Sequence, residues 1–172
     1  MTPIPNFLAG ERDRGDDQRD DTPSAPSAPG RGSLDASDAS ARDSAARLTI
    51  LLVEDDSALT EPWSGSLRFA GYECEIAPDA PTALAILADE TQRIAIMIAD
   101  LDLAGSDGAA LIRTARDMPR YSTLPVIITS GDETQSAYER ACHAGMDAYL
   151  VKPVATPTLL RTIARWTRAK SG

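Results

Sequence analysis

The sequence contains few of the residues from which metal–thiolate, disulfide or histidine-based sites are built. It has two cysteines, Cys74 and Cys142, and a single histidine, His143, among 172 residues. The cysteines form no C-x-x-C pair, and a lone histidine beside a helix is commonly a packing or surface residue. We therefore predict two reduced cysteines that act as small apolar residues, and the sequence argues against a zinc site.

Long apolar runs are also missing. No stretch approaches the roughly 20 apolar residues that a membrane helix needs, and no basic start followed by an apolar run marks a secretory signal. The formal net charge is −9, which argues against non-specific binding to nucleic acid, because such binding needs Lys and Arg to displace phosphate counterions. We expect a cytoplasmic protein whose partners are proteins, with no membrane or nucleic-acid partner.

Large apolar residues are scarce in the N-terminal segment 1–47, in which Pro, Ser, Ala, Gly, Asp and Arg dominate. A segment of this composition cannot bury enough apolar surface to offset its ordering entropy, so we predict a disordered tail. Only Ile4–Leu8 has the apolar character to dock on a folded domain. The sequence leaves open whether the tail is a docking segment, a linker or an extension without function.

From Leu48 onward, apolar runs alternate with helical segments. Three runs have the continuous apolar, β-branched composition of strands that are buried on both faces, and two shorter ones are further candidates; they are Leu48–Val53, Ile94–Ala99, Val126–Thr129, Tyr72–Ile76 and Ala148–Val151. The helical segments between and after them are Ser57–Ala70, Ala80–Ala88, Gly108–Arg116, Glu133–Ala144 and Thr158–Ala169. This alternation predicts an α/β domain at 48–170, with a parallel sheet covered by helices on both faces.

The first of these helices is the least regular. Pro62 and Gly65 interrupt Ser57–Ala70, and a proline in a helix interior costs about 3 kcal/mol. We therefore expect this helix to begin late, near Thr60, or to be kinked.

Polar side chains follow the apolar runs at the points where the strands should end. Because ligands of open parallel sheets lie beyond the carboxyl ends of the strands, these side chains should converge on one pocket. The residues are Glu54, Asp55, Asp56, Asp100, Asp102, Ser130 and Lys152. A cluster of carboxylates repels itself unless a positive charge lies within it, so we expect Lys152 and a Mg²⁺ ion there.

The same group of residues suggests a chemistry. A carboxylate can attack phosphorus to form an acyl phosphate, while a metal ion and a lysine neutralise charge on the transferring group. Taken singly, the residues have simpler explanations: Asp55 and Asp56 as helix caps, Asp107 and Gly108 as a turn, and Lys152-Pro153 as a strand exit. Their joint occurrence at strand ends favours a site, with Asp100 as the phosphoryl acceptor.

Four motifs in order resemble the receiver domain of two-component signalling, the family of the bacterial chemotaxis response regulator: ILLVEDD, ADLDLAGSDG, LPVIITSGD and AYLVKPV. The spacings are similar too, with 44 residues from Asp56 to Asp100, 30 from there to Ser130 and 22 more to Lys152. The resemblance covers about 120 residues. It implies a flavodoxin-like, doubly wound sheet of five parallel strands in the order 2-1-3-4-5 with five helices.

The resemblance also implies roles for individual residues. Asp55, Asp56 and Asp100 resemble the side chains that hold Mg²⁺, and Asp102 stands where the family uses a backbone carbonyl as a further ligand. Asp100 corresponds to the phosphorylated aspartate. Ser130 and Lys152 correspond to the conserved hydroxyl and lysine, and Tyr149 to the aromatic switch residue.

The implied activity is acceptance of a phosphoryl group from a histidine kinase or a histidine phosphotransfer protein. Ser130 and Tyr149 would then shift a pre-existing equilibrium of the surface made by the fourth helix, fifth strand and fifth helix. We expect a signalling domain that catalyses only its own phosphorylation and dephosphorylation, with an unknown target protein. The oligomeric state stays open, a homodimer included.

Some positions depart from the family pattern. Ala104 stands where a proline is common, so that loop should be less rigid. Asp102 and Asp132 bring acidic side chains beside the site, and we predict that they modulate the lifetime of the acyl phosphate.

Three alternatives to a stand-alone switch remain. The domain could be a pseudo-receiver that binds partners without phosphate, which the complete set of site residues disfavours. It could be a fragment of a larger hybrid kinase, because no output domain follows Pro153. It could be an aspartyl-phosphate hydrolase, with Asp100 and Asp102 as its aspartate pair, but the chain has no room for a substrate cap.

Overall fold

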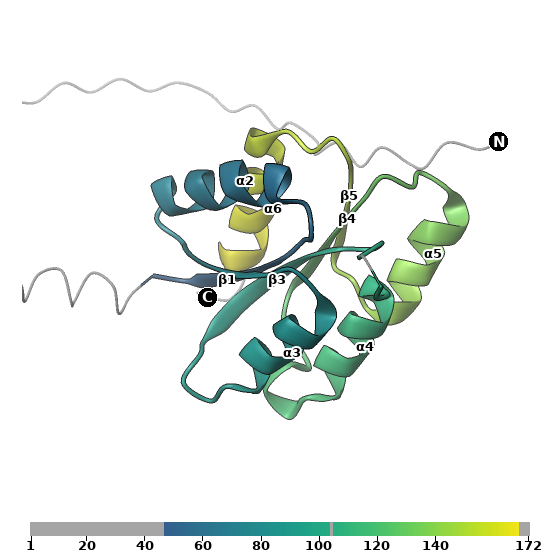
Figure 1. Ribbon diagram of the computed structural model, residues 1–172, viewed down its shortest axis with the longest axis horizontal. Helices are drawn as coiled ribbons and strands as arrows, with labels where there is room; N and C mark the ends of the chain where they lie inside the picture. The colour runs from purple at the N-terminus through teal and green to yellow at the C-terminus, as the bar shows by residue number, and fades with distance from the viewer. Residues whose placement is uncertain (1–46, 104, 169–172) are drawn as a thin grey trace, which may run out of the picture. The chain divides into compact units, whose positions relative to one another are not determined.

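The computed structural model describes residues 47–103 and 105–168 (Figure 1). The predicted disordered tail and Ala104 lie outside the described residues. Within these ranges, the strands form one sheet; their bounds are β1 Thr49–Val53, β2 Glu73–Ala77, β3 Ile94–Asp100, β4 Val126–Ser130 and β5 Ala148–Val151. All neighbouring strands pair in parallel, in the order β2-β1-β3-β4-β5. The predicted α/β fold and strand order are confirmed.

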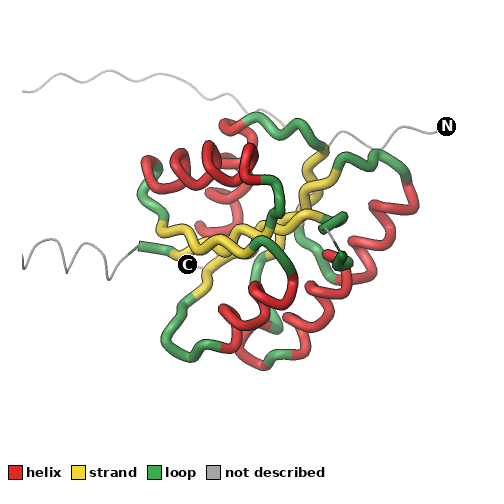
Figure 2. The backbone as a smooth tube through the Cα atoms, viewed as in Figure 1, coloured by secondary structure: helices red, strands yellow, loops and turns green. Residues whose placement is uncertain are grey.

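Helices alternate with these strands along the chain (Figure 2). Their bounds are α2 Ser57–Phe69, α3 Ala80–Ala88, α4 Gly108–Asp117, α5 Gln135–Ala144 and α6 Thr156–Arg168, with a short 3₁₀ helix, η1, at Pro119–Tyr121. The limits of the predicted ranges lie within two residues of the observed ones. No helix in the described part of the chain is long and apolar enough to cross a membrane.

The helices divide between the two faces of the sheet, with α2 and α6 on one side and α3, α4 and α5 on the other (Figure 1). Successive side chains of a strand point to opposite faces. In β1, Leu51 and Val53 therefore pack toward α3 and α4, whereas Ile50 and Leu52 pack toward Trp63 of α2 and its neighbours. This double burial explains why the central strands are continuously apolar.

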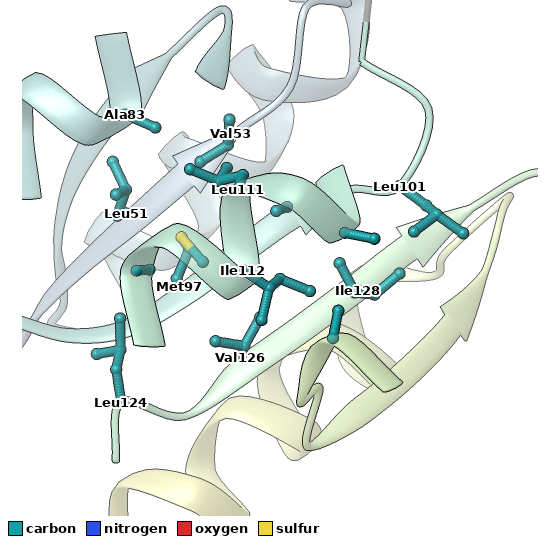
Figure 3. Packing of buried hydrophobic residues seen from close by; sticks show 14 of the residues in the cluster. Leu51, Val53, Ala83, Met97, Leu101, Leu111, Ile112, Leu124, Val126 and Ile128 are labelled. Atoms are coloured by element: carbon teal, nitrogen blue, oxygen red, sulfur yellow. The ribbon is translucent and has the colours of Figure 1, made fainter. Parts of the chain in front are cut away.

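Branched and long aliphatic side chains fill the larger of the two cores. Figure 3 shows Leu111 and Ile112 of α4 close to strand residues of β1, β3 and β4. Leu111 and Ile112 are almost completely buried, as are Met97 and Ile128. At about 1.5–3 kcal/mol for each fully buried aliphatic side chain, this packing fixes α4 against the strand ends.

Helix α2 begins at Ser57. Of the two alternatives expected for it, a late start near Thr60 or a kink, the late start is wrong. The carboxylate of Asp56 accepts a hydrogen bond from the Ala58 amide at 2.8 Å and caps the helix at its first turn. Pro62 lies inside the helix on its exposed face. A proline there leaves the Ala58 carbonyl without its helical donor, and Ala58 is itself exposed, so water can satisfy that group.

Helix α5 rests on the sheet through small side chains. Its buried residues are Ala137, Ala141 and Ala144. It ends at Gly145, whose φ of 94° is in the left-handed region that favours glycine as a helix stop. The fully buried part of the contact between α5 and the core is therefore made by methyl groups.

Arg116, near the end of α4, connects three loop segments through hydrogen bonds and an ion pair. Its guanidinium donates to the Gly145 carbonyl at 2.7 Å and pairs with Asp147 Oδ2 at 3.0 Å. It also donates to the carbonyls of Tyr121 at 3.3 Å and of Leu124. The Asp147 carboxylate in turn accepts a hydrogen bond from the Val126 amide at 2.8 Å. The Arg116 guanidinium therefore links the segments that lead into β4 and β5.

Candidate functional site

The carboxyl ends of β1 and β3 bring three acidic side chains together. Glu54 follows β1 and is 3% exposed, whereas its neighbour Asp55 is exposed. Asp100 is the last residue of β3 and is 7% exposed. One carboxylate oxygen from each lies within 4.8 Å of the others. The sheet therefore creates an acidic cluster, defined here as Glu54, Asp55 and Asp100, at the edge where the sequence predicted a pocket.

Lys152, just after β5, supplies the positive charge of this site. Its ammonium nitrogen lies 2.7 Å from Oδ2 of Asp100 and 2.7 Å from Oε2 of Glu54. The Lys152 amide donates to the carbonyl of Ser130 at 2.8 Å, which fixes the backbone from which the side chain reaches back. The predicted meeting of Asp55, Asp100 and Lys152 is present in the structure.

Burial and charge change the acidity of two of these groups. Burial raises the pKa of Glu54 above its ordinary value, and the hydrogen bond and charge of Lys152 offset only part of that rise. Burial alone would lower the pKa of Lys152, but hydrogen bonds and charges of Asp100 and Glu54 outweigh it and raise the pKa. Lys152 therefore stays protonated near neutral pH, where the cluster can attract a further cation.

The donor set fits a hard divalent cation. The cluster offers oxygen atoms only, and these are the ligands that Mg²⁺ and Ca²⁺ take in proteins. The Lys152 ammonium pairs with two of the three carboxylates, those of Glu54 and Asp100. Glu54 Oε2 is buried with no hydrogen-bond donor among the described residues other than that ammonium. A second positive charge would relieve the remaining repulsion.

Asp56 does not join the cluster, although the sequence analysis placed it there. Its carboxylate caps α2, and the third member of the acidic cluster is instead Glu54. The Glu54 amide still bonds to the Ala77 carbonyl of β2 at 3.1 Å, so the strand pairing extends as far as Glu54. The preference of Asp for the position before a helix was the signal that could have assigned Asp56 as a cap.

Ser130, the last residue of β4, is fully buried, and its hydroxyl is hydrogen-bonded. Its hydroxyl donates to Asp102 Oδ2 at 3.1 Å and accepts from the Asp132 amide at 3.0 Å. The other oxygen of the exposed Asp102 carboxylate pairs with Arg140 of α5 at 2.9 Å. Sequence reasoning missed Arg140, because nothing in a helix pattern indicates which strand-end residue an exposed arginine meets.

The Asp132 carboxylate is hydrogen-bonded to the residue that caps α5, Thr134. Oδ1 accepts from the Thr134 amide at 2.8 Å, and the hydrogen bonds from Thr134 lower the pKa of Asp132. Of the two acidic residues predicted beside the site, Asp102 is thus the one whose side chain contacts Ser130.

Tyr149 of β5 lies between the site and α5. Its hydroxyl donates to the Asp132 carbonyl at 2.6 Å, and its ring packs edge-on against Tyr138 with centroids 5.6 Å apart. Burial raises the pKa of Tyr149 above its ordinary value. The predicted switch residue therefore touches both the loop after Ser130 and the helix that bears Arg140.

The start of α4 packs directly against the backbone of Asp100. The Gly108 amide donates to the Leu101 carbonyl at 3.0 Å. A Cβ on Gly108 would overlap with the Asp100 carbonyl oxygen and come within 2.9 Å of Leu101 Cα. Only glycine permits this close approach. The Asp102 amide donates to Asp100 Oδ1 at 3.0 Å and so orients the Asp100 carboxylate.

Residues 50–164 match the family model described as "Response regulator receiver domain". The response regulator protein FleR of Pseudomonas aeruginosa is 36% identical over 116 residues, which are 67% of this chain and 24% of FleR. The chain spans about half the length of the MprA response regulators that it also matches.

Solved structures agree with these sequence matches. The chemotaxis response regulator CheY4 of Vibrio cholerae superimposes with a TM-score of 0.66 at 27% identity, over 70% of this chain and 98% of CheY4. The receiver domain of the sensor histidine kinase PA1611 of Pseudomonas aeruginosa, solved with a magnesium ion in its active-site cleft, has a TM-score of 0.63 at 30% identity, over 71% of this chain and 98% of that domain.

Proposed function

Since the chain belongs to the response regulator receiver domain family, whose members are signalling domains and not conventional enzymes, we propose that Asp100 is its phosphoryl acceptor. The donor is the phosphohistidine of a histidine kinase or of a histidine phosphotransfer protein. The phosphorylated domain then signals by contact with another protein.

One observation carries this proposal: the carboxylate of Asp100 is almost buried and is held at both oxygens. Lys152 contacts Oδ2 at 2.7 Å, and the Asp102 amide donates to Oδ1 at 3.0 Å. Such a carboxylate is fixed in orientation, and orientation of reacting groups is a main source of rate in phosphoryl transfer. A carboxylate with only a structural role would need neither the neighbouring acidic cluster nor the position at a strand end.

The metal ion that this site would hold is Mg²⁺, the ion present in the active-site cleft of the PA1611 receiver domain. The side chains that would hold it are those of Glu54, Asp55 and Asp100, together with the backbone carbonyl of Asp102. Bound there, the ion neutralises negative charge on the phosphoryl oxygens. Asp56 takes no part in this set, because its carboxylate caps α2.

In the transfer step, a carboxylate oxygen of Asp100 attacks the phosphorus atom. The P–O bond of the acyl phosphate forms as the P–N bond of the phosphohistidine breaks, and the electron pair returns to the imidazole nitrogen. Lys152 stays protonated and moves from its ion pair with Asp100 to the phosphoryl oxygens, where negative charge is then concentrated. No proton has to be removed from the nucleophile.

Ser130 and Tyr149 change position in response to the phosphoryl group. Ser130 is drawn toward the new phosphoryl oxygens, and the loop that carries Asp132 follows. Tyr149 loses its hydrogen bond to the Asp132 carbonyl and turns inward. The equilibrium of the surface formed by α5, β5 and α6 then shifts toward the form that binds a partner.

The test is intact-mass measurement of the full chain after incubation with Mg²⁺ and acetyl phosphate, a small phosphodonor. We expect a gain of one phosphoryl group. The gain should be absent in Asp100→Asn and after chelation of the metal, whereas Asp56→Asn should still be modified. A label that persists in Asp100→Asn would overturn the proposal, and rapid donor turnover without lasting modification would indicate a hydrolase.

A further inference from the structure

Arg140 is linked to the phosphorylation site although its own position is on the exposed side of α5. Its guanidinium lies 2.9 Å from Asp102 Oδ1, and Asp102 Oδ2 accepts the hydrogen bond of the Ser130 hydroxyl at 3.1 Å. A single carboxylate therefore connects a helix of the outer layer with a side chain at the end of β4.

The hydroxyl of Ser130 cannot serve two acceptors at once. A serine hydroxyl carries one proton, and Ser130 gives this proton to Asp102. Donation to a phosphoryl oxygen on Asp100 requires that the bond to Asp102 breaks first. The Asp102 carboxylate is thus a competitor of the phosphoryl group for the same donor.

We propose that Arg140 is a positioning residue that fixes the Asp102 carboxylate and so holds the Ser130 hydroxyl in its unphosphorylated arrangement. This inference rests on the proposed function of Asp100. Phosphorylation breaks the Ser130–Asp102 hydrogen bond and releases Asp102 from one of its two partners. The Arg140–Asp102 ion pair then carries the change to α5.

The expected effect is modest. About half of each side chain in this ion pair is exposed to solvent, 46% for Arg140 and 54% for Asp102, and exposed pairs contribute little. Loss of the pair should therefore change the balance between the two positions of Ser130 by roughly 2- to 5-fold. An effect of this size alters signalling sensitivity without abolishing phosphorylation.

The experiment measures the affinity of the Mg²⁺-loaded full chain for beryllofluoride, a tetrahedral analogue of the phosphoryl group, by NMR titration. Arg140→Gln should bind the analogue about 2- to 5-fold more tightly than the wild type. In an Asp102→Ala background, which already lacks the competing acceptor, Arg140→Gln should have no further effect. Arg140→Lys keeps the charge without the guanidinium geometry and should lie between the wild type and Arg140→Gln.

A matched control separates the ion pair from net charge. Arg113 of α4 is equally basic and exposed, and it pairs with Asp107 at 3.6 Å instead of Asp102. Arg113→Gln removes the same charge and should leave the affinity unchanged. An equal gain in Arg113→Gln, or a gain from Arg140→Gln that persists in the Asp102→Ala background, would overturn the inference.

A second readout needs no phosphoryl analogue. The Asp132 amide donates to the Ser130 hydroxyl oxygen, so its ¹⁵N–¹H resonance in the metal-free protein should shift in Arg140→Gln and not in Arg113→Gln. No shift would count against the inference even if the wild type is phosphorylated normally. A wild type that binds no beryllofluoride, with the resonance shift present, would instead overturn the proposed role of Asp100.

Discussion

The ammonium nitrogen of Lys152 lies 2.7 Å from carboxylate oxygen Oδ2 of Asp100, although 52 residues separate them in the sequence. The parallel sheet produces this contact, because β3 and β5 flank β4 and their carboxyl ends lie at the same edge. The same ammonium also contacts Glu54 after β1. One cation therefore joins the ends of three strands.

Removal of Lys152 should destabilise the metal-free protein. In Lys152→Ala, the buried carboxylates of Glu54 and Asp100 lose the one cation that pairs with them among the described residues, and breaking a buried ion pair on one side costs about 3 kcal/mol. Mg²⁺ restores positive charge to the cluster, so it should recover part of the loss. Urea unfolding of wild type and variant with and without Mg²⁺ measures this, and an identical loss in both conditions would argue against a shared charge balance.

Glu54 and Asp56 should differ sharply in their effect on metal binding. We expect Glu54→Gln and Asp55→Asn each to weaken Mg²⁺ binding at least about 10-fold, because each removes a charged oxygen from the cluster. Asp56→Ala should leave Mg²⁺ affinity almost unchanged but lower the free energy of unfolding by about 1 kcal/mol through loss of the helix cap. Isothermal titration and urea unfolding separate the two effects. An equal loss of Mg²⁺ affinity in the Asp56 variant would instead support the metal ligands expected from the sequence, which include Asp56.

Gly108→Ala should disturb the proposed phosphorylation site through a shift of α4. The added Cβ would overlap with the Asp100 carbonyl oxygen, so α4 must move away from the end of β3. We expect a loss of stability of about 2 kcal/mol and slower labelling by acetyl phosphate. Gly65→Ala is the control, since a Cβ at Gly65 meets nothing within 4 Å; its stability should be unchanged or slightly higher.

The two cysteines should react at very different rates. Burial raises the pKa of Cys74 to about 11 from an ordinary value of 9.0, whereas Cys142 is exposed. At pH 8 a disulfide reagent should modify one thiol in the native protein and both in urea, and Cys142→Ser should remove the native reaction. Because folding keeps Cys74 protonated, its contribution to stability is complete below pH 9 and is lost as the pH rises toward 11.

Arg116→Lys should destabilise the fold more than a surface change of the same kind. Lysine keeps the charge but cannot reach the carbonyls of Gly145 and Tyr121 together with Asp147. We expect a loss of about 2 kcal/mol. Arg113→Lys, at an exposed pair with Asp107, should change stability by less than about 0.5 kcal/mol. Thermal unfolding of both variants checks the difference.

The sequence could predict the sheet because its central strands are buried on both faces. That burial makes Ile94–Asp100 and Val126–Ser130 continuous apolar runs, and each run ends in a polar residue that marks the site. The start of α2 was predicted too late because we expected Pro62 to disrupt the first part of the helix. In the structure Pro62 lies on the exposed face and Asp56 caps the first turn, so the helix forms around the proline.

Contacts that depend on side-chain direction were harder to predict. Three adjacent acidic residues, Glu54, Asp55 and Asp56, lie between β1 and α2. Their side chains point in different directions because of where β1 ends and α2 begins: Glu54 joins the acidic cluster, and Asp56 caps the helix. The ion pair between Asp102 and Arg140 joins positions 38 residues apart. Neither follows from periodicity, since both depend on how a loop is folded over the strand ends.

The alanine face of α5 has a mechanical consequence. Helix α6 is anchored by Leu159 and Ile163, long side chains that must leave their places in the core if the helix moves. Helix α5 has only the methyl groups of Ala137, Ala141 and Ala144 in that position. A helix whose buried side chains are alanines vacates less volume when it moves than a helix anchored by leucine and isoleucine, so α5, which bears Arg140 and packs against Tyr149, should shift at a lower cost in free energy than α6.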